Sequence, residues 1–235
     1  MATETISETK IGCIVLDEEL QIPLGIQNLA DFRAWAYSDE FPEKGRIDFI
    51  GHRIEVTMSP EELASHGSPK VEILRVFANL NKGQKLGEVY VDRARISSPT
   101  AELSAEPDIV FVLRDTLKSG RARKIPKASQ EHGRFIEIEG AVDLVVEVIS
   151  DSSVTKDRSR LPPAYFEAGV QEFWLVDARR DDLFFQIHHR GETAFQPVPL
   201  DEEGFQRSNV LDRRYRLERE PDDVSDWIYD LLEAE

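Results

Sequence analysis

The spacing of apolar side chains in the first part of the chain predicts a helix followed by a β-hairpin. Residues 28–37 carry leucine, phenylalanine and alanine at helical spacing, and Asn28 can cap the start of that helix. Residues 46–57 form two β-like stretches around a short loop that begins with Gly51, which is typical of a hairpin. Residues 1–27 show no sustained period and are expected to be an extended lead-in.

The segment after the hairpin combines helix signals with helix breakers. Residues 59–62 read SPEE and supply an N-cap serine, a proline at the first helical position and a capping-box glutamate. We therefore expect a helix to begin there. Gly67 and Pro69 predict a break before residues 71–80, whose apolar stripe at helical spacing is expected to lie in the core.

From Glu88 onward the period changes to two, which predicts a series of short strands. Residues 109–113 and 143–149 are almost continuously apolar, as is typical of strands that are covered on both faces. Residues 164–169 predict a short helix that follows a pair of prolines and ends at a glycine. The expected strands are residues 88–92, 93–97, 109–113, 143–149, 173–177 and 183–189.

Length and composition fit one globular domain with an extension at each end. The chain has 235 residues, of which 40% are hydrophobic, and this is enough to bury a substantial core. We expect the domain to span residues 28–200, preceded by the lead-in of residues 1–27. Residues 201–235 are highly charged and end in an amphipathic stretch, so a peripheral extension is expected there.

The composition and the distribution of apolar residues argue against several classes of protein. No run of about 18 apolar residues could span a bilayer, and the N-terminus lacks the features of a secretory signal, so a cytoplasmic protein is expected. Cys13 is the single cysteine, which excludes an intrachain disulfide and a cysteine-based zinc cluster. The net charge of −16 implies that any contact with DNA is local or weak, because proteins that hold nucleic acid mainly by charge are usually basic.

Glu147 is the residue of greatest chemical interest in the sequence. Strand alternation places it on the same face as Val145 and Ile149, within an apolar stretch. A carboxylate buried there costs several kcal/mol unless a cation, a hydrogen-bond donor or a proton satisfies it. Either a functional site or a structural ion pair with a nearby basic residue would meet that need.

Asp108 strengthens the case for a site. It follows Pro107 directly and precedes the strand at 109–113, where a neighbouring strand could bring it close to Glu147. Two carboxylates on adjacent strands provide the oxygen ligands that Mg²⁺ prefers and leave positions for water and a phosphate. The alternative is that Asp108 only caps the turn.

Four ordered segments of the chain resemble the Uma-two family of endonucleases, which belongs to the PD-(D/E)XK superfamily. The segments are RIDFIGHRIEVTMSPEELASH, AEPDIVFV, AVDLVVEVISDSS and AYFEAGVQEFWLVDAR. The resemblance covers about residues 30–190. It implies a restriction-endonuclease-like α+β fold, with a mixed central sheet flanked by helices, an N-terminal hairpin and a C-terminal extension.

The resemblance also implies which residues carry the chemistry. Asp108 and Glu147 match the aspartate and glutamate of the family's motif, whereas Ile149 occupies the position where the superfamily usually has lysine. In this family a basic residue further along is thought to replace that lysine. Lys156 is the preferred candidate, with Arg158 and Arg160 as alternatives.

The early acidic residue of the family falls on or near Asp48, with Glu43 and Glu55 as competitors. By resemblance, Asp108, Glu147, the carbonyl of Val148 and Asp48 would hold Mg²⁺ or Mn²⁺, and the ion would polarise a phosphodiester and activate water. The lysine would orient that water or stabilise developing charge.

Residues 114–127 are expected to form a basic loop between the two strands that carry these carboxylates. Arg121, Arg123 and Lys124 in it could contact the phosphates of DNA, or the loop could simply be solvated. His66 follows the family's pattern, but a lone histidine is more often a structural hydrogen-bonding residue.

Three functions compete on these grounds. The first is a metal-dependent endonuclease that cuts DNA as a homodimer, since two-fold dimers commonly cleave both strands of a duplex. The second is an inactive nucleic-acid-binding or regulatory module that retains the fold. In the third, Asp108 and Glu147 are ion-pair partners in a domain with another task.

Overall fold

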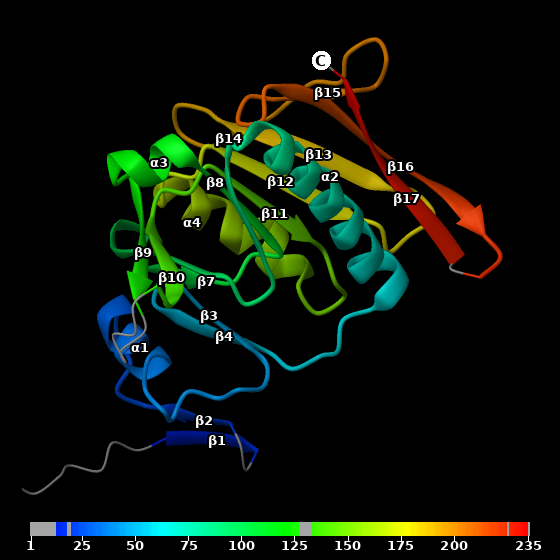
Figure 1. Ribbon diagram of the computed structural model, residues 1–235. Helices are drawn as coiled ribbons and strands as arrows, with labels where there is room; N and C mark the ends of the chain where they lie inside the picture. Colours follow the sequence, from blue (N-terminus) through cyan, green and yellow to red (C-terminus); the bar gives the residue numbers. More distant parts are fainter. Residues whose placement is uncertain (1–12, 18–19, 127–132, 225, 235) are drawn as a thin grey trace, which may run out of the picture.

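The computed structural model describes residues 13–17, 20–126, 133–224 and 226–234. Most of the described strands belong to two six-stranded sheets (Figure 1). The first sheet has the order β4 (Arg53–Thr57), β3 (Arg46–Ile50), β7 (Leu103–Ala105), β6 (Arg95–Ser98), β10 (Phe135–Gly140) and β9 (Ala122–Pro126). The second has the order β14 (Phe195–Pro197), β13 (Phe184–Arg190), β12 (Glu172–Asp177), β11 (Leu144–Val148), β8 (Ile109–Leu113) and β5 (Gly87–Val91).

Both sheets are mixed, which confirms the predicted α+β class. In the second sheet, β11 pairs with β12 in parallel and with β8 in antiparallel orientation. In the first, β10 pairs with β6 in parallel, and the hairpin predicted at residues 46–57 is present as β3 and β4. The division of the strands between two sheets is a detail that their periodicity did not specify.

Strand β11 is covered on both faces, as its continuous apolar sequence predicts. Val145 contributes to a core cluster that includes residues of the first sheet and of helix α4 (Leu161–Glu167). Leu144 and Val146 point to the opposite face and join a second cluster with helix α2 (Ser68–Gln84). Glu147 therefore lies in a strand between two apolar layers and is fully buried.

The helices begin and end where their capping residues allow. Helix α1 (Leu29–Ala36) is capped as predicted, because the side chain of Asn28 accepts a hydrogen bond from the backbone of Asp31. Helix α2 does not begin at residue 59 or 60 as the sequence predicts. Instead, Glu62 caps a π-helical turn, η1 (Leu63–Gly67), that leads into α2.

The basic segment, predicted as a loop at 114–127, is ordered over the described residues 114–126, so that prediction is wrong there. It forms helix α3 (Arg114–Ser119) and strand β9, which pairs with β10. The basic side chains of this strand pair with carboxylates: Arg123 pairs with Glu139 on the adjacent β10, and Lys124 pairs with Glu88 on β5 of the second sheet. Strand pairing and these ion pairs were not visible in the local sequence.

The C-terminal segment forms a sheet of β15 (Gln206–Ser208), β16 (Arg213–Asp222) and β17 (Asp226–Ala234). Figure 1 shows β16 and β17 beside helix α2. Tyr215 and Leu231 are buried in the same apolar cluster as that helix, so the prediction of a merely peripheral extension is wrong. The predicted domain boundaries at residues 27 and 200 stay predictions.

The remaining elements are short. Strands β1 (Cys13–Asp17) and β2 (Leu20–Pro23) form a two-stranded sheet, and Leu20 packs in a small cluster with helix α1. The turns η2 (Pro99–Ala101) and η3 (Lys156–Arg160) complete the described structure. None of the described helices combines the length and apolar character needed to cross a membrane.

Candidate active site

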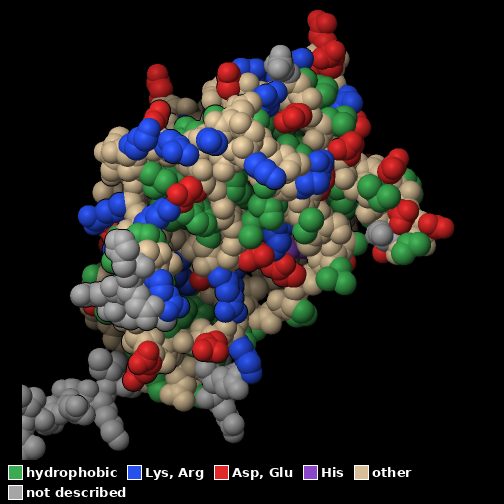
Figure 2. Space-filling view, in the orientation of Figure 1, with side chains coloured by type: hydrophobic (Ala, Val, Ile, Leu, Met, Phe, Trp, Pro, Cys, Tyr) green, Lys and Arg blue, Asp and Glu red, His purple; other side chains and the backbone are tan. Residues whose placement is uncertain are grey.

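Asp108 lines a cleft of about 430 Å³, and the other predicted carboxylates, Asp48 and Glu147, are buried beside it in contact with Arg46. The lining of this cleft includes Arg46 from β3, His66 from η1, Lys156 from η3, and Asp108 from the turn before β8. Figure 2 shows acidic and basic side chains side by side on this face of the molecule. The hairpin, the turn before β8 and the segment after β11 thus contribute to one site from distant parts of the sequence.

Asp108 is fixed against the strand that carries Glu147. Its Oδ2 accepts a hydrogen bond of 2.7 Å from the backbone N–H of Val148, which is the residue after Glu147. This contact follows from the pairing of β8 with β11, where Ile109 lies opposite Val146. The adjacency of Asp108 and Glu147 that the sequence analysis required is therefore present, and both residues are buried.

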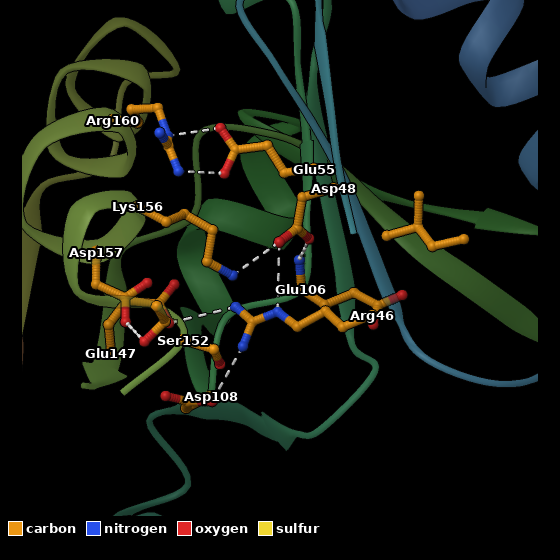
Figure 3. A network of polar contacts seen from close by, with 12 residues as sticks. Arg46, Asp48, Glu55, Glu106, Asp108, Glu147, Ser152, Lys156, Asp157 and Arg160 are labelled. Atoms are coloured by element: carbon orange, nitrogen blue, oxygen red, sulfur yellow. Dashed lines mark hydrogen bonds and ion pairs between the residues drawn. The ribbon is translucent and has the colours of Figure 1, made fainter. Parts of the chain in front are cut away.

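Arg46, which was not among the predicted site residues, connects the carboxylates. Its guanidinium lies 3.4 Å from carboxylate oxygens of Asp48, Asp108 and Glu147, as Figure 3 shows. Alternation along β3 offered a signal, because Arg46 and Asp48 are two residues apart and share one face of the strand. An arginine beside a candidate ligand was a visible partner for the buried charges.

The two central carboxyl groups differ strongly in proton affinity. Burial alone would raise the pKa of Asp108, but the hydrogen bond from His66 and the charge of Arg46 outweigh it and leave the pKa at about 2. Burial raises the pKa of Glu147 to about 8, and the negative charge of Asp108 adds to the rise against the opposing effect of Arg46. The hydroxyl of Tyr165 also donates a hydrogen bond to Glu147.

Lys156 reaches the site as a partner of Asp48. Its ammonium lies 2.9 Å from Asp48 Oδ2, and both side chains are almost fully buried. The competing candidates have other partners: Arg158 pairs with Asp177, and Arg160 pairs with Glu55. The catalytic roles of Lys156 and Asp48 stay predictions.

The remaining competitor, Glu43, lies at a different hollow. That hollow has a volume of about 1000 Å³ and adjoins the cleft, since Asp92, Arg93 and Glu106 line both. The geometry favours Asp48, because its carboxylate contacts Arg46 and Lys156, which both line the cleft, whereas Glu43 lines only the other hollow.

His66 forms part of a second set of ligand atoms at the cleft. One ligand atom each from Glu61, His66 and Asp108 lie within 4.8 Å of one another. His66 Nε2 lies 3.5 Å from Asp108, and its buried Nδ1 has no hydrogen-bond partner among the described residues, although Glu61 is 3.4 Å away. As a lone histidine, His66 was predicted to be structural, and nothing in the sequence connected it with Asp108.

The carboxylate oxygens and the imidazole nitrogen at the cleft suit a divalent cation, but the guanidinium of Arg46 already lies beside two of the carboxylates. Carboxylate oxygens with one imidazole nitrogen are ligands that Mn²⁺ accepts, whereas Mg²⁺ prefers oxygen alone. The inner pair, Asp108 and Glu147, can coordinate an ion only if the guanidinium of Arg46 leaves the space between them. The outer set of Glu61, His66 and Asp108 faces the cleft directly.

The basic residues predicted to contact DNA do not line this cleft. Arg121 pairs with Asp143, and Arg123 and Lys124 have the ion pairs described above. Lys124 lines the larger adjoining hollow instead. Their assignment to DNA binding stays a prediction.

A family profile described as "Uma2: Putative restriction endonuclease" matches residues 29–218, which is most of the chain. The chain belongs to the Uma2 family. This confirms the resemblance drawn from the four sequence segments and places the protein in a family of nuclease type. No curated protein matches the chain.

A solved structure supports the fold assignment of this Uma2 protein. The match is a crystal structure described as a "putative nuclease belonging to DUF820 from Anabaena variabilis ATCC 29413". It aligns with a TM-score of 0.53 at 17% sequence identity, over 79% of this chain and 90% of that one. At this identity the similarity shows a shared fold.

Proposed function

We propose that this Uma2 protein is a metal-dependent endonuclease that hydrolyses phosphodiester bonds in DNA. The observation that carries the proposal is the convergence of Asp108 and Glu147 on Arg46 at the edge of one cleft, with Lys156 and Asp48 beside them. We further propose that it acts as a homodimer, because two-fold symmetry suits the cleavage of both strands of a duplex.

Asp108 and Glu147 would hold Mg²⁺ or Mn²⁺, with the carbonyl of Val148 and with Asp48 assisting directly or through water. Such an ion supplies charge that polarises the phosphate and lowers the pKa of a water molecule. The hydrogen bond from the Val148 N–H fixes the orientation of the Asp108 carboxylate. Because Asp108 stays ionised at a pKa of about 2, it would offer a charged ligand at any physiological pH.

Lys156 is the chain's candidate for the role of the missing motif lysine. Burial lowers its pKa, but the attraction of Asp48, Glu147 and Asp157 together outweighs burial and raises it, so Lys156 carries a positive charge. An ammonium at the edge of the cleft can donate to the attacking water or to the phosphate and stabilise charge as the P–O bond breaks. Ile149, at the usual lysine position, is fully buried and cannot do this.

The first experiment separates metal binding from turnover. Mn²⁺ and Mg²⁺ should raise the melting temperature of the wild type by about 5 °C at saturating ion, because a ligand bound only by the folded state stabilises it. Asp108→Asn and Glu147→Gln should abolish that shift. Glu139→Gln serves as the control, since Glu139 pairs with Arg33 and Arg123 outside the cleft.

Cleavage of plasmid DNA, measured alongside the melting temperature, tests the catalytic role of Lys156. Lys156→Ala should lower kcat by about 100-fold while the metal-induced shift in melting temperature remains. Arg158→Ala is the matched control, because Arg158 lies two residues away and pairs with Asp177. Full cleavage by Lys156→Ala would remove Lys156 from the proposal.

The alternative function is a nucleic-acid-binding or regulatory module without turnover. It is favoured by one observation: Arg46 already neutralises the carboxylates that an ion would need. A wild type that binds DNA but cleaves none with Mg²⁺ or Mn²⁺ would establish this alternative.

A further inference from the structure

Arg46 is held loosely for an arginine among so many carboxylates. Its three contacts to carboxylate oxygens are all 3.4 Å, and its buried Nε has no hydrogen-bond partner among the described residues. Charge-assisted N–H···O bonds are usually about 2.7–2.9 Å. Arg33 shows the contrast, because it contacts Glu137 at 2.8 Å and Glu139 at 2.6 Å with similar side-chain exposure.

The position of Arg46 explains the long contacts. Its guanidinium lies between Asp48, Asp108 and Glu147, and it cannot approach one of them closely without leaving another (Figure 3). It therefore acts as a shared counter-ion. A small divalent cation binds carboxylate oxygens at about 2.0–2.2 Å and would neutralise the same charges at shorter range.

Arg46 also stands between the cleft and Glu147. The Arg46 side chain is 22% exposed and lines the cleft, whereas Glu147 is fully buried and does not line it. An ion that enters from solvent and binds Glu147 must take the place of the guanidinium. Two cations cannot share that space, because both would need the same oxygen atoms and would repel each other.

We propose that Arg46 is a displaceable counter-ion, which a divalent metal ion replaces between Asp108 and Glu147 and which then turns into the cleft to bind the substrate phosphate. This inference rests on the proposed metal-dependent function. A guanidinium suits the second role, because its planar set of N–H donors matches two phosphate oxygens at once. Because the Arg46 side chain already lines the cleft, rotation of this one side chain would move its guanidinium from the carboxylates into the cleft.

The proposal predicts that replacing Arg46 strengthens the binding of Mn²⁺ and slows the cleavage of DNA. Arg46→Gln should bind Mn²⁺ at least about 10-fold more tightly than the wild type, because the ion no longer competes with the guanidinium. The same variant should cleave DNA at least about 100-fold more slowly, because a charged phosphate ligand is lost. An arginine with a purely structural role would not tighten metal binding when removed.

The experiment titrates Mn²⁺ by isothermal calorimetry into the full-length wild type and its variants, and measures DNA cleavage in parallel. Arg33→Gln is the matched control and should change neither quantity, since Arg33 pairs with two carboxylates but does not line the cleft. In a Glu147→Gln background, Arg46→Gln should not restore Mn²⁺ binding, because a ligand that the ion needs is gone.

Arg46→Lys is a second variant, which tests the proposal even if Arg46→Gln does not fold. A lysine keeps the positive charge but cannot span three carboxylates, so its Mn²⁺ affinity should rise by a smaller factor, while cleavage should stay impaired.

The outcomes separate this inference from the proposed function. Tighter Mn²⁺ binding with slower cleavage supports it. Equal or weaker binding by the Arg46 variants, with binding still lost in Asp108→Asn, overturns the displacement and leaves the metal site intact. Absence of Mn²⁺ binding by both wild type and variants overturns the metal site and this inference together.

Discussion

At the scale of single residues, the site consists of two carboxyl groups that the fold keeps in different protonation states. Asp108 accepts hydrogen bonds and has a pKa of about 2, whereas Glu147 lies between apolar layers and has a pKa of about 8. The ionised form of Glu147 is therefore costly to the folded state in the absence of a metal ion. That cost gives a measurable dependence of stability on pH.

In metal-free buffer, the free energy of unfolding should fall as the pH rises from about 5 to about 8. The unfolded chain loses the Glu147 proton near its ordinary pKa of 4.5, whereas the folded protein keeps it up to about 8. Between these values the folded state binds more protons, so rising pH favours unfolding. Asp108 acts in the opposite sense, and the stability it contributes is lost only as the pH falls below about 4 towards 2.

Glu147→Gln tests this assignment, because glutamine resembles the protonated carboxyl group. Over pH 5 to 8 it should lose less stability than the wild type by at least about 1.4 kcal/mol, the equivalent of one pKa unit. Urea denaturation at several pH values in EDTA measures the difference. Glu139→Gln should behave as the wild type, since the pKa of Glu139 is lowered by Arg33 and Arg123 against burial. Parallel pH profiles for wild type and Glu147→Gln would contradict the assignment.

At the scale of elements, the site depends on the layers that hold β8 and β11 in place. Helix α2 and the C-terminal hairpin of β16 and β17 cover one face of the second sheet. The backbone N–H of Leu231 in β17 donates a hydrogen bond of 2.9 Å to Glu72 in α2. The hairpin is therefore part of the support for the strands that carry the carboxylates.

Leu231→Ala should reduce the free energy of unfolding by about 2–5 kcal/mol, because it leaves a cavity in the core. Leu231 is 2% exposed, whereas Ile228 in the same strand is 48% exposed. The control Ile228→Ala should cost much less, since its side chain is already half in water. Equal losses in urea denaturation of the two variants would show that the hairpin is not part of the cooperative core.

At the scale of the whole molecule, the net charge of −16 opposes binding to a polyanion. The basic residues of β9 would have to exchange their carboxylate partners for phosphates. This exchange lowers the affinity that each basic residue can contribute, so weak and salt-sensitive binding is expected.

Replacing Arg121, Arg123 and Lys124 together with glutamine should weaken DNA binding at every sequence, because phosphate contacts carry no base information. The slope of log affinity against log salt should become shallower by about 1–3, since each lost contact removes about 0.9. Fluorescence anisotropy at several salt concentrations measures the slope. Replacement of Arg207, Arg214 and Arg216, which form ion pairs in the C-terminal sheet, is the control for net charge. Matching slopes in the two triple variants would remove β9 as a DNA contact.

The sequence by itself determined the features that depend on near neighbours. The continuous apolar runs of β8 and β11 predicted strands buried on both faces, and strand alternation, which requires only local backbone geometry, predicted the side that Glu147 takes. The cost of burying Glu147 predicted that it needs a partner. Family membership, too, could be inferred from short ordered segments, and the profile over residues 29–218 confirms it.

Only the tertiary structure decided which distant groups meet. The ion pair of Lys156 with Asp48 spans 108 positions in the sequence, and that of Arg46 with Glu147 spans 101. Strand periodicity fixes a side chain's face but not its neighbouring strand. It placed Arg46 beside Asp48, but the contacts of Arg46 with Asp108 and Glu147 could not be predicted. The approach of His66 to Asp108 was hidden in the same way. The burial of Tyr215 and Leu231 was hidden for the same reason, because their partners on α2 lie far away along the chain.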